Sequence, residues 1–172
     1  MKDRGPFHSA DTTGGWRNHY ARIRRWGRRV LELAKREAIQ EIDHQDLVDF
    51  ALVYFIWAHS LLEWLVVDEA SKADSSKAAA FGHPQWRLLC ALANRSRHFD
   101  QTLKVDQLDK YWSIKRSYDP FLSQLTDQSG VGTQIVYNGQ KYALSELVRR
   151  ISKMWSDILD QSDLNPDELW RP

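Results

Sequence analysis

The sequence predicts an all-α protein, an up-and-down four-helix bundle with a small β-hairpin before the last helix. Three observations support this prediction. Several long stretches repeat apolar residues at the three- and four-residue spacing of an amphipathic helix, and eight Trp among 172 residues suit a compact core or a sticky interface. One Asn138-Gly139 pair, which favours a tight type I′ turn, lies between two short β-prone runs.

The chain is long enough for about one domain. We expect a flexible N-terminal arm over residues 1–16, one helical-bundle domain over 17–161 and a C-terminal tail over 162–172. The net charge of +1 gives no global field that would attract nucleic acid or membrane, and the single Cys90 excludes an internal disulfide. We find no apolar run of about 18 residues and no signal peptide, so we expect a cytoplasmic protein with no membrane partner.

The first helix is expected over residues 18–40 and is strongly basic. Residues 1–36 hold ten Lys and Arg against three acidic residues, although the whole chain is nearly neutral. Arg22, Arg25 and Arg29 recur at three- and four-residue spacing and therefore share one face. Two interpretations stand equally: a face that binds phosphates, or a solvated face paired with acids elsewhere.

The second helix is expected from Asp43, as its N-cap, to about residue 69. Two polar residues interrupt its apolar stripe, His59 and Glu63, which lie one helical turn apart. Such a pair can supply two metal ligands, or a base with its orienting carboxylate. With two candidate ligands and no further metal motif, an ordinary intrahelical polar pair is the favoured interpretation, and we expect neither a metal nor another cofactor.

The third helix is expected over residues 86–99, after an Ala- and Ser-rich connection at 70–82 that we interpret as flexible. Its last turns carry Asn94, Arg95, Arg97 and His98. Two guanidiniums, an imidazole and a carboxamide suit phosphate binding, because arginine offers a fork of donors and histidine exchanges protons near neutral pH. The alternative is that the basic residues simply cap the helix C-terminus.

The residue pattern of 103–125 is compatible with both a helix and an extended strand, and we slightly favour the helix. The hairpin is expected over 134–143, and Ser145 is expected to cap a last helix that ends near residue 161. Its inward positions are apolar: Leu147, Val148, Ile151, Met154, Trp155 and Ile158.

Two motifs resemble the HEPN superfamily, and more narrowly a group of small bacterial and phage-linked proteins within it. They are Phe55-Ile-Trp-Ala-His-Ser-Leu-Leu-Glu-Trp64 and Cys90-Ala-Leu-Ala-Asn-Arg-Ser-Arg-His98, in that order. The resemblance covers residues 43–100 best, and the hairpin and last helix loosely. It implies a four-helix bundle that is often a homodimer, packed here through the two central helices.

In active HEPN members, an Arg and a His with four to six residues between them cleave RNA without metal at the dimer interface. The resemblance thus implies catalysis by His98 with Asn94, Arg95 and Arg97. The three positions at the standard spacing before His98 are Ala91, Leu92 and Ala93, so the usual arginine is missing. Arg87, or an arginine of a dimer mate, is the substitute that remains.

Two classes of function follow. One is an RNA-binding or metal-independent ribonuclease-like protein of toxin or phage-defence type, with Arg22, Arg25 and Arg29 on the RNA. The other is a catalytically inactive HEPN-like interaction module for a protein partner or small ligand. We also consider a composite site in which His59 and Glu63 face Asn94 and His98, so that Glu63 fixes an imidazole.

Overall fold

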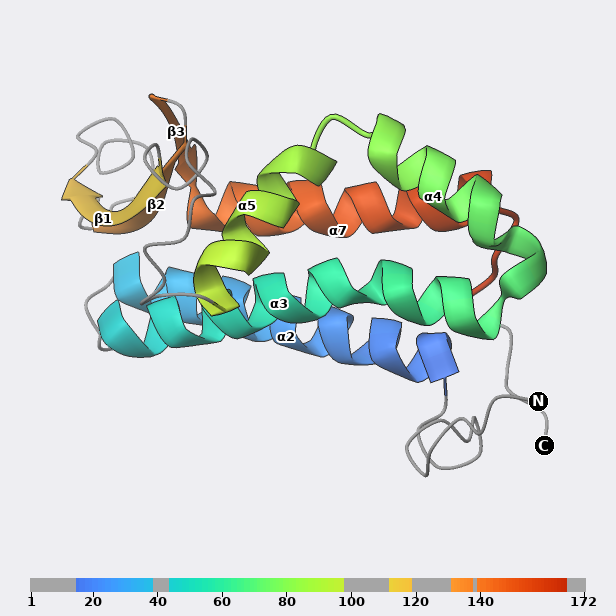
Figure 1. The fold of residues 1–172 in the computed structure, drawn as a ribbon. Helices are drawn as coiled ribbons and strands as arrows, with labels where there is room; N and C mark the ends of the chain where they lie inside the picture. Colours follow the sequence, from blue (N-terminus) through green and yellow to red (C-terminus); the bar gives the residue numbers. More distant parts are fainter. Residues whose placement is uncertain (1–14, 39–43, 98–111, 119–130, 138, 167–172) are drawn as a thin grey trace.

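The computed structural model describes residues 15–38, 44–97, 112–118, 131–137 and 139–166. These residues form a mostly helical fold with a small antiparallel sheet (Figure 1). The elements in order are α2 (Gly15–Ala38), α3 (His44–Asp68), η1 (Ala70–Lys72), α4 (Ala73–Gly82), α5 (Trp86–Arg97), β1 (Trp112–Tyr118), β2 (Val131–Tyr137), β3 (Gln140–Ala143) and α7 (Leu144–Gln161).

The helices of the bundle alternate in direction along the chain: α2, α3, then α4 with α5, then α7 (Figure 1). The third of these segments is divided into the two helices α4 and α5. The break falls at His83 and Pro84, where His83 has an extended backbone (φ −77°, ψ 133°). A residue before proline is disfavoured in the helical region because the proline ring clashes with it, which explains why the helix stops there. The expected helices at 18–40, 43–69, 86–99 and 145–161 are confirmed within the described residues.

The interior is held where α2, α3 and α7 meet. Tyr54 of α3 is fully buried, and its hydroxyl donates to the Val148 carbonyl of α7 at 3.2 Å. Gly27 of α2 lies over this ring, since a Cβ at that position would stand 3.1 Å from Tyr54 Cε2. The glycine therefore allows α2 to approach the two other helices closely.

A second centre of packing is Trp86, at the start of α5. Its ring contacts the rings of Phe81 (5.8 Å between centroids), His59 (5.5 Å) and Trp155 (6.1 Å). One buried indole thus joins α3, α4, α5 and α7, which is consistent with the large area that a tryptophan can bury.

The sheet has the order β1-β2-β3, with both pairs antiparallel. Tyr137 pairs with Gln140 next to Gly139, whose φ of 76° is a left-handed conformation that glycine adopts without strain. The hairpin is therefore confirmed. Within the ambiguous stretch, residues 112–118 form a strand rather than the slightly favoured helix, so the hairpin is part of a three-stranded sheet.

Three further expectations can be compared with the structure. The connection at 70–82, predicted to be flexible, is helical, because Ser76 and Ala80 of α4 are buried in the bundle. The predicted cap by Ser145 is wrong: α7 begins one residue earlier, and no side chain caps it. The Asp43 cap lies outside the described residues. At the N-terminal boundary, α2 begins at Gly15, and Trp16 is buried rather than part of an arm.

Among the described residues, α3 alone is long and apolar enough to cross a membrane by length and composition. This corrects the expectation that no apolar run has that length. A helix in the core of a protein can have the same length and composition. Helix α3 packs against α2, α4 and α5, and its residues Leu47, Leu61 and Leu65 are fully buried.

Candidate nucleic-acid interface

The polar cluster predicted at the end of α5 lies only partly within the described residues. Asn94 is exposed, as is Arg87 near the start of α5. Arg95 and Arg97 belong to the last turn of the helix, but His98 lies outside the described part of the chain. The joint role of these residues therefore stays a prediction.

His59 and Glu63 are not brought to Asn94. The His59 ring stacks on Trp86 at an interplanar angle of 18°, while Glu63 is exposed. Trp86 and Asn94 are eight residues apart on one helix, which is about 12 Å at the usual helical rise. His59 thus lies at the beginning of α5 and Asn94 near its end. With His98 outside the described residues, the four-residue composite site as a whole is untested.

Arg22, Arg25 and Arg29 do come together. They line a hollow of about 480 Å³ on the surface between α2 and α3, together with Trp26 and Trp57. Helical spacing on α2 places the three guanidiniums and Trp26 on one side, and α3 contributes Trp57 from the other. We call these five residues the arginine groove.

Aromatic rings of α3 support the arginines. The Arg22 guanidinium lies 5.6 Å from the centre of the Trp57 ring, and Arg29 lies at the same distance from Phe50. The Phe50 ring also packs against Trp26, with 5.4 Å between centroids. Such cation–π contacts hold a guanidinium in place while its N–H groups remain able to bind an anion.

Few acids offset this charge. Glu32 lies 3.9 Å from Arg29 in an exposed pair, and within the described residues neither Arg22 nor Arg25 forms an ion pair. An exposed pair of this kind contributes little. The interpretation that the arginines are paired with acids elsewhere therefore finds no support among the described residues, and the groove keeps most of its positive charge.

His19 of α2 is buried and contacts Trp57, one of the five residues of the arginine groove. Its ring stands 4.8 Å from Trp57 and 5.0 Å from Trp64, and Nε2 lies 2.9 Å from the Trp57 carbonyl oxygen. Burial lowers the pKa of this imidazole, because the charged form loses its hydration, and the nearby Arg22 charge acts in the same direction. His19 is thus a neutral core residue between two indoles.

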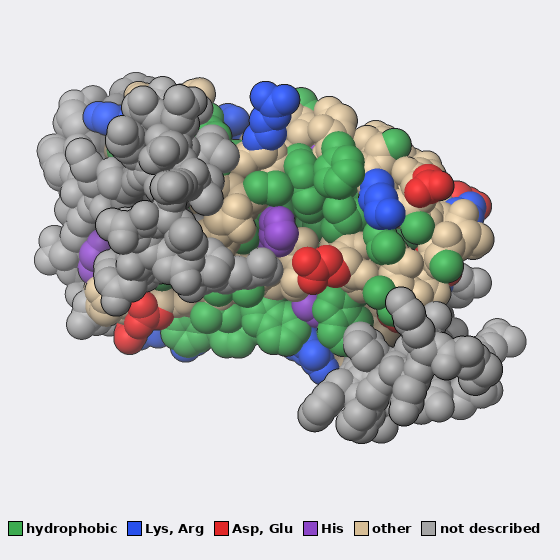
Figure 2. All heavy atoms as spheres, viewed as in Figure 1, with side chains coloured by type: hydrophobic (Ala, Val, Ile, Leu, Met, Phe, Trp, Pro, Cys, Tyr) green, Lys and Arg blue, Asp and Glu red, His purple; other side chains and the backbone are tan. Residues whose placement is uncertain are grey.

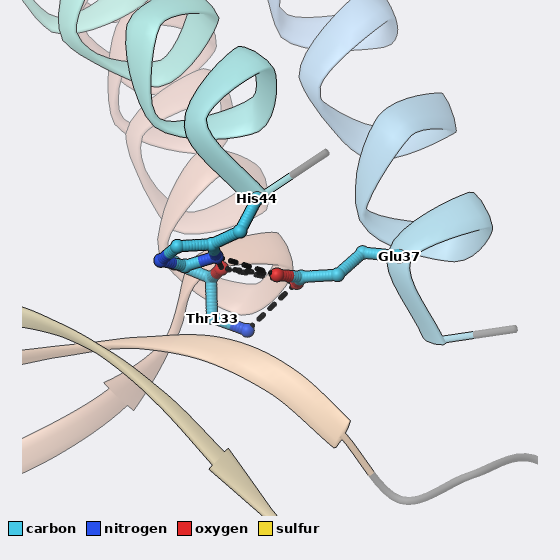
Figure 3. Close-up of polar contacts among 3 residues, drawn as sticks. All are labelled: Glu37, His44 and Thr133. Atoms are coloured by element: carbon cyan, nitrogen blue, oxygen red, sulfur yellow. Dashed lines mark hydrogen bonds and ion pairs between the residues drawn. The ribbon is translucent and has the colours of Figure 1, made fainter. Parts of the chain in front are cut away.

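A second polar cluster, which sequence reasoning missed, joins Glu37 of α2, His44 of α3 and Thr133 of β2 (Figure 3). The Glu37 side chain is only 1% exposed. A signal was available in the sequence: Ile23, Val30 and Glu37 recur every seven residues, so this carboxylate lies on the apolar stripe of the helix.

The described residues contain no group of three or more His, Cys, Asp or Glu side chains that could hold a metal ion. Cys90 is a half-buried thiol whose pKa is raised by burial, so it favours the protonated, weakly nucleophilic form.

No protein-family model matches the chain, and neither the curated proteins nor the solved structures contain a match.

Proposed function

We propose that this chain is a HEPN-like helical-bundle protein that binds RNA in the arginine groove. The observation that carries the proposal is the groove itself: three guanidiniums gathered beside two indoles in one open hollow. Arginines bind phosphate oxygens through their forked donors, and aromatic faces stack on unpaired bases. The HEPN resemblance of residues 55–64 and 90–98 favours the same substrate class.

The test is binding of a fluorescein-labelled single-stranded RNA, followed by anisotropy in the presence of a chelator. Replacing the three groove arginines together, as Arg22→Gln, Arg25→Gln and Arg29→Gln, should weaken binding at least tenfold. The matched control removes three exposed charges of α7, as Arg149→Gln, Arg150→Gln and Lys153→Gln, and should change the affinity less than threefold. Equal losses in both triple variants would contradict a specific groove.

The cleavage that the resemblance implies belongs to the same proposal. His98 would exchange the proton, with Asn94, Arg95 and Arg97 on the phosphate and Arg87 or a partner's arginine in place of the missing one. RNA cleavage that persists in the chelator and disappears in His98→Ala would support this assignment.

A second candidate function is an interaction module, and one observation favours it. The Phe81 side chain is 63% exposed beside Trp86, and Val67 of α3 is 43% exposed. Figure 2 shows hydrophobic side chains on this face along α3 and over the region where α4 meets α5. We propose that this surface serves a symmetric homodimer. A light-scattering mass of two chains that falls to one in Phe81→Glu would support it, whereas a wild-type mass of one chain would exclude the dimer.

A further inference from the structure

The cluster of Glu37, His44 and Thr133 satisfies a buried carboxylate with three donors (Figure 3). The Thr133 backbone N–H donates to Oε2 at 2.9 Å, and the Thr133 hydroxyl lies 2.9 and 3.0 Å from the two carboxylate oxygens. Nδ1 of His44 lies 2.7 Å from Oε1. Such donors are what a buried carboxylate requires, because an unsatisfied buried oxygen costs free energy.

This geometry fixes the tautomer of His44. The Thr133 hydroxyl carries one hydrogen, and its two short distances to Glu37 assign that hydrogen to the carboxylate. Nδ1 of His44 faces both the carboxylate and the Thr133 oxygen, at 2.7 and 3.0 Å, and both are acceptors towards it. The proton of the neutral imidazole must then sit on Nδ1, which leaves the lone pair on Nε2.

Nε2 lies on the opposite edge of the ring from Glu37 (Figure 3), and the His44 side chain is 28% exposed. Within the described residues, Nε2 forms no hydrogen bond. A carboxylate that orients Nδ1, and an Nε2 whose lone pair has no partner among the described residues, are the two parts of a general base.

The cluster also lies along the α2–α3 interface, as the arginine groove does. Three contacts join α2 to α3 in register: Arg22 with Trp57, Arg29 with Phe50, and Glu37 with His44. Successive contacts are seven or eight residues apart on α2, which is about 10 to 12 Å at the helical rise. The oriented histidine therefore follows Arg29 at the next contact of the same helix pair.

We propose that His44, oriented by Glu37 and Thr133, is an acid–base group that cleaves single-stranded RNA held in the arginine groove. Nε2 takes the proton of a ribose 2′-hydroxyl, whose oxygen forms a bond to the adjacent phosphorus. The bond from phosphorus to the 5′-oxygen breaks, and that oxygen takes a proton from water. The products are a 2′,3′-cyclic phosphate and a 5′-hydroxyl, with no oxidant or metal required. This inference rests on the proposed RNA binding, but it uses a different histidine from His98.

The test distinguishes the structural role of Nδ1 from the proposed catalytic role of Nε2. In His44→Asn, the side-chain amide can still donate to Glu37, while the atom corresponding to Nε2 is gone. This variant should keep its far-UV circular dichroism and its RNA affinity within about threefold, yet lose cleavage by at least about 100-fold, the usual contribution of a positioned acid–base group.

A second variant covers the case in which His44→Asn fails to fold. His44→Ala removes the whole ring, and added imidazole should restore part of its cleavage, an effect that a purely structural histidine would not show. Wild-type protein that binds RNA without cleaving it overturns the inference but not the RNA binding. Cleavage that depends on His98 and not on His44 overturns it as well. Wild-type protein that fails to bind RNA overturns both proposals.

Discussion

Each end of the α2–α3 interface holds a histidine, and the two histidines differ in their polar partners and in their exposure. At one end, His19 lies between Trp57 and Trp64 and is 2% exposed. Its only hydrogen-bond partners among the described residues are the Trp57 carbonyl and the Ser60 hydroxyl, both at Nε2. At the other end, Nδ1 of His44 meets the buried carboxylate of Glu37, and the His44 side chain is 28% exposed.

The difference shows that a histidine's role is set by its acceptors and its exposure rather than by its place on a helix. Removing the hydration of His19 without supplying an anion favours the neutral ring, so this histidine acts as an aromatic core residue. The buried carboxylate of Glu37 instead orients the His44 ring, because the hydrogen bond to Nδ1 fixes the tautomer of the neutral imidazole.

The largest effect is expected from Glu37→Leu. The substitution leaves the Thr133 N–H and hydroxyl buried without their acceptor and removes the closer of the two acceptors of His44 Nδ1–H, which should cost about 3 kcal/mol of unfolding free energy. Urea denaturation measures the loss. The matched control Glu32→Leu changes an exposed glutamate of the same helix and should stay within about 0.5 kcal/mol. Equal stability of the two variants would show that the carboxylate does not tie the sheet to the helices.

A smaller, pH-dependent effect is expected from His19→Phe. The unfolded chain titrates His19 near pH 6.5, whereas burial lowers the folded pKa, so below about pH 6.5 the unfolded state binds more protons. The wild type should therefore lose stability as the pH falls from 7.5 to 5.5, by at most about 1.4 kcal/mol per pH unit from this group. His19→Phe should lose less over the same range. A parallel decline in both proteins would mean that His19 is not held neutral.

The sequence predicted the features that depend on local spacing. Apolar periodicity located the long helices, and Asn138-Gly139 located the hairpin. The shared face of Arg22, Arg25 and Arg29 followed from helical geometry. These features need only the order of residues within one element.

Features that depend on packing between elements were missed. Helix α4 buries only Ser76 and Ala80, so its composition resembles a linker. Strand β1 is fixed by pairing Trp112 with Tyr137, which is distant in the chain. The aromatic side of the groove, and the contact of Glu37 with Thr133, likewise depend on which residues the folded elements place opposite one another. Spacing alone cannot supply that register.

The most direct test of RNA binding in the arginine groove is the salt dependence of the affinity. Each phosphate neutralised on a single strand contributes about 0.7 to the slope of log K against log salt. Replacing Arg22, Arg25 and Arg29 with Gln should therefore reduce the slope by about 2, since 3 × 0.7 ≈ 2. The α7 triple variant, Arg149→Gln with Arg150→Gln and Lys153→Gln, should keep the wild-type slope. An unchanged slope in the groove variant would contradict the assignment.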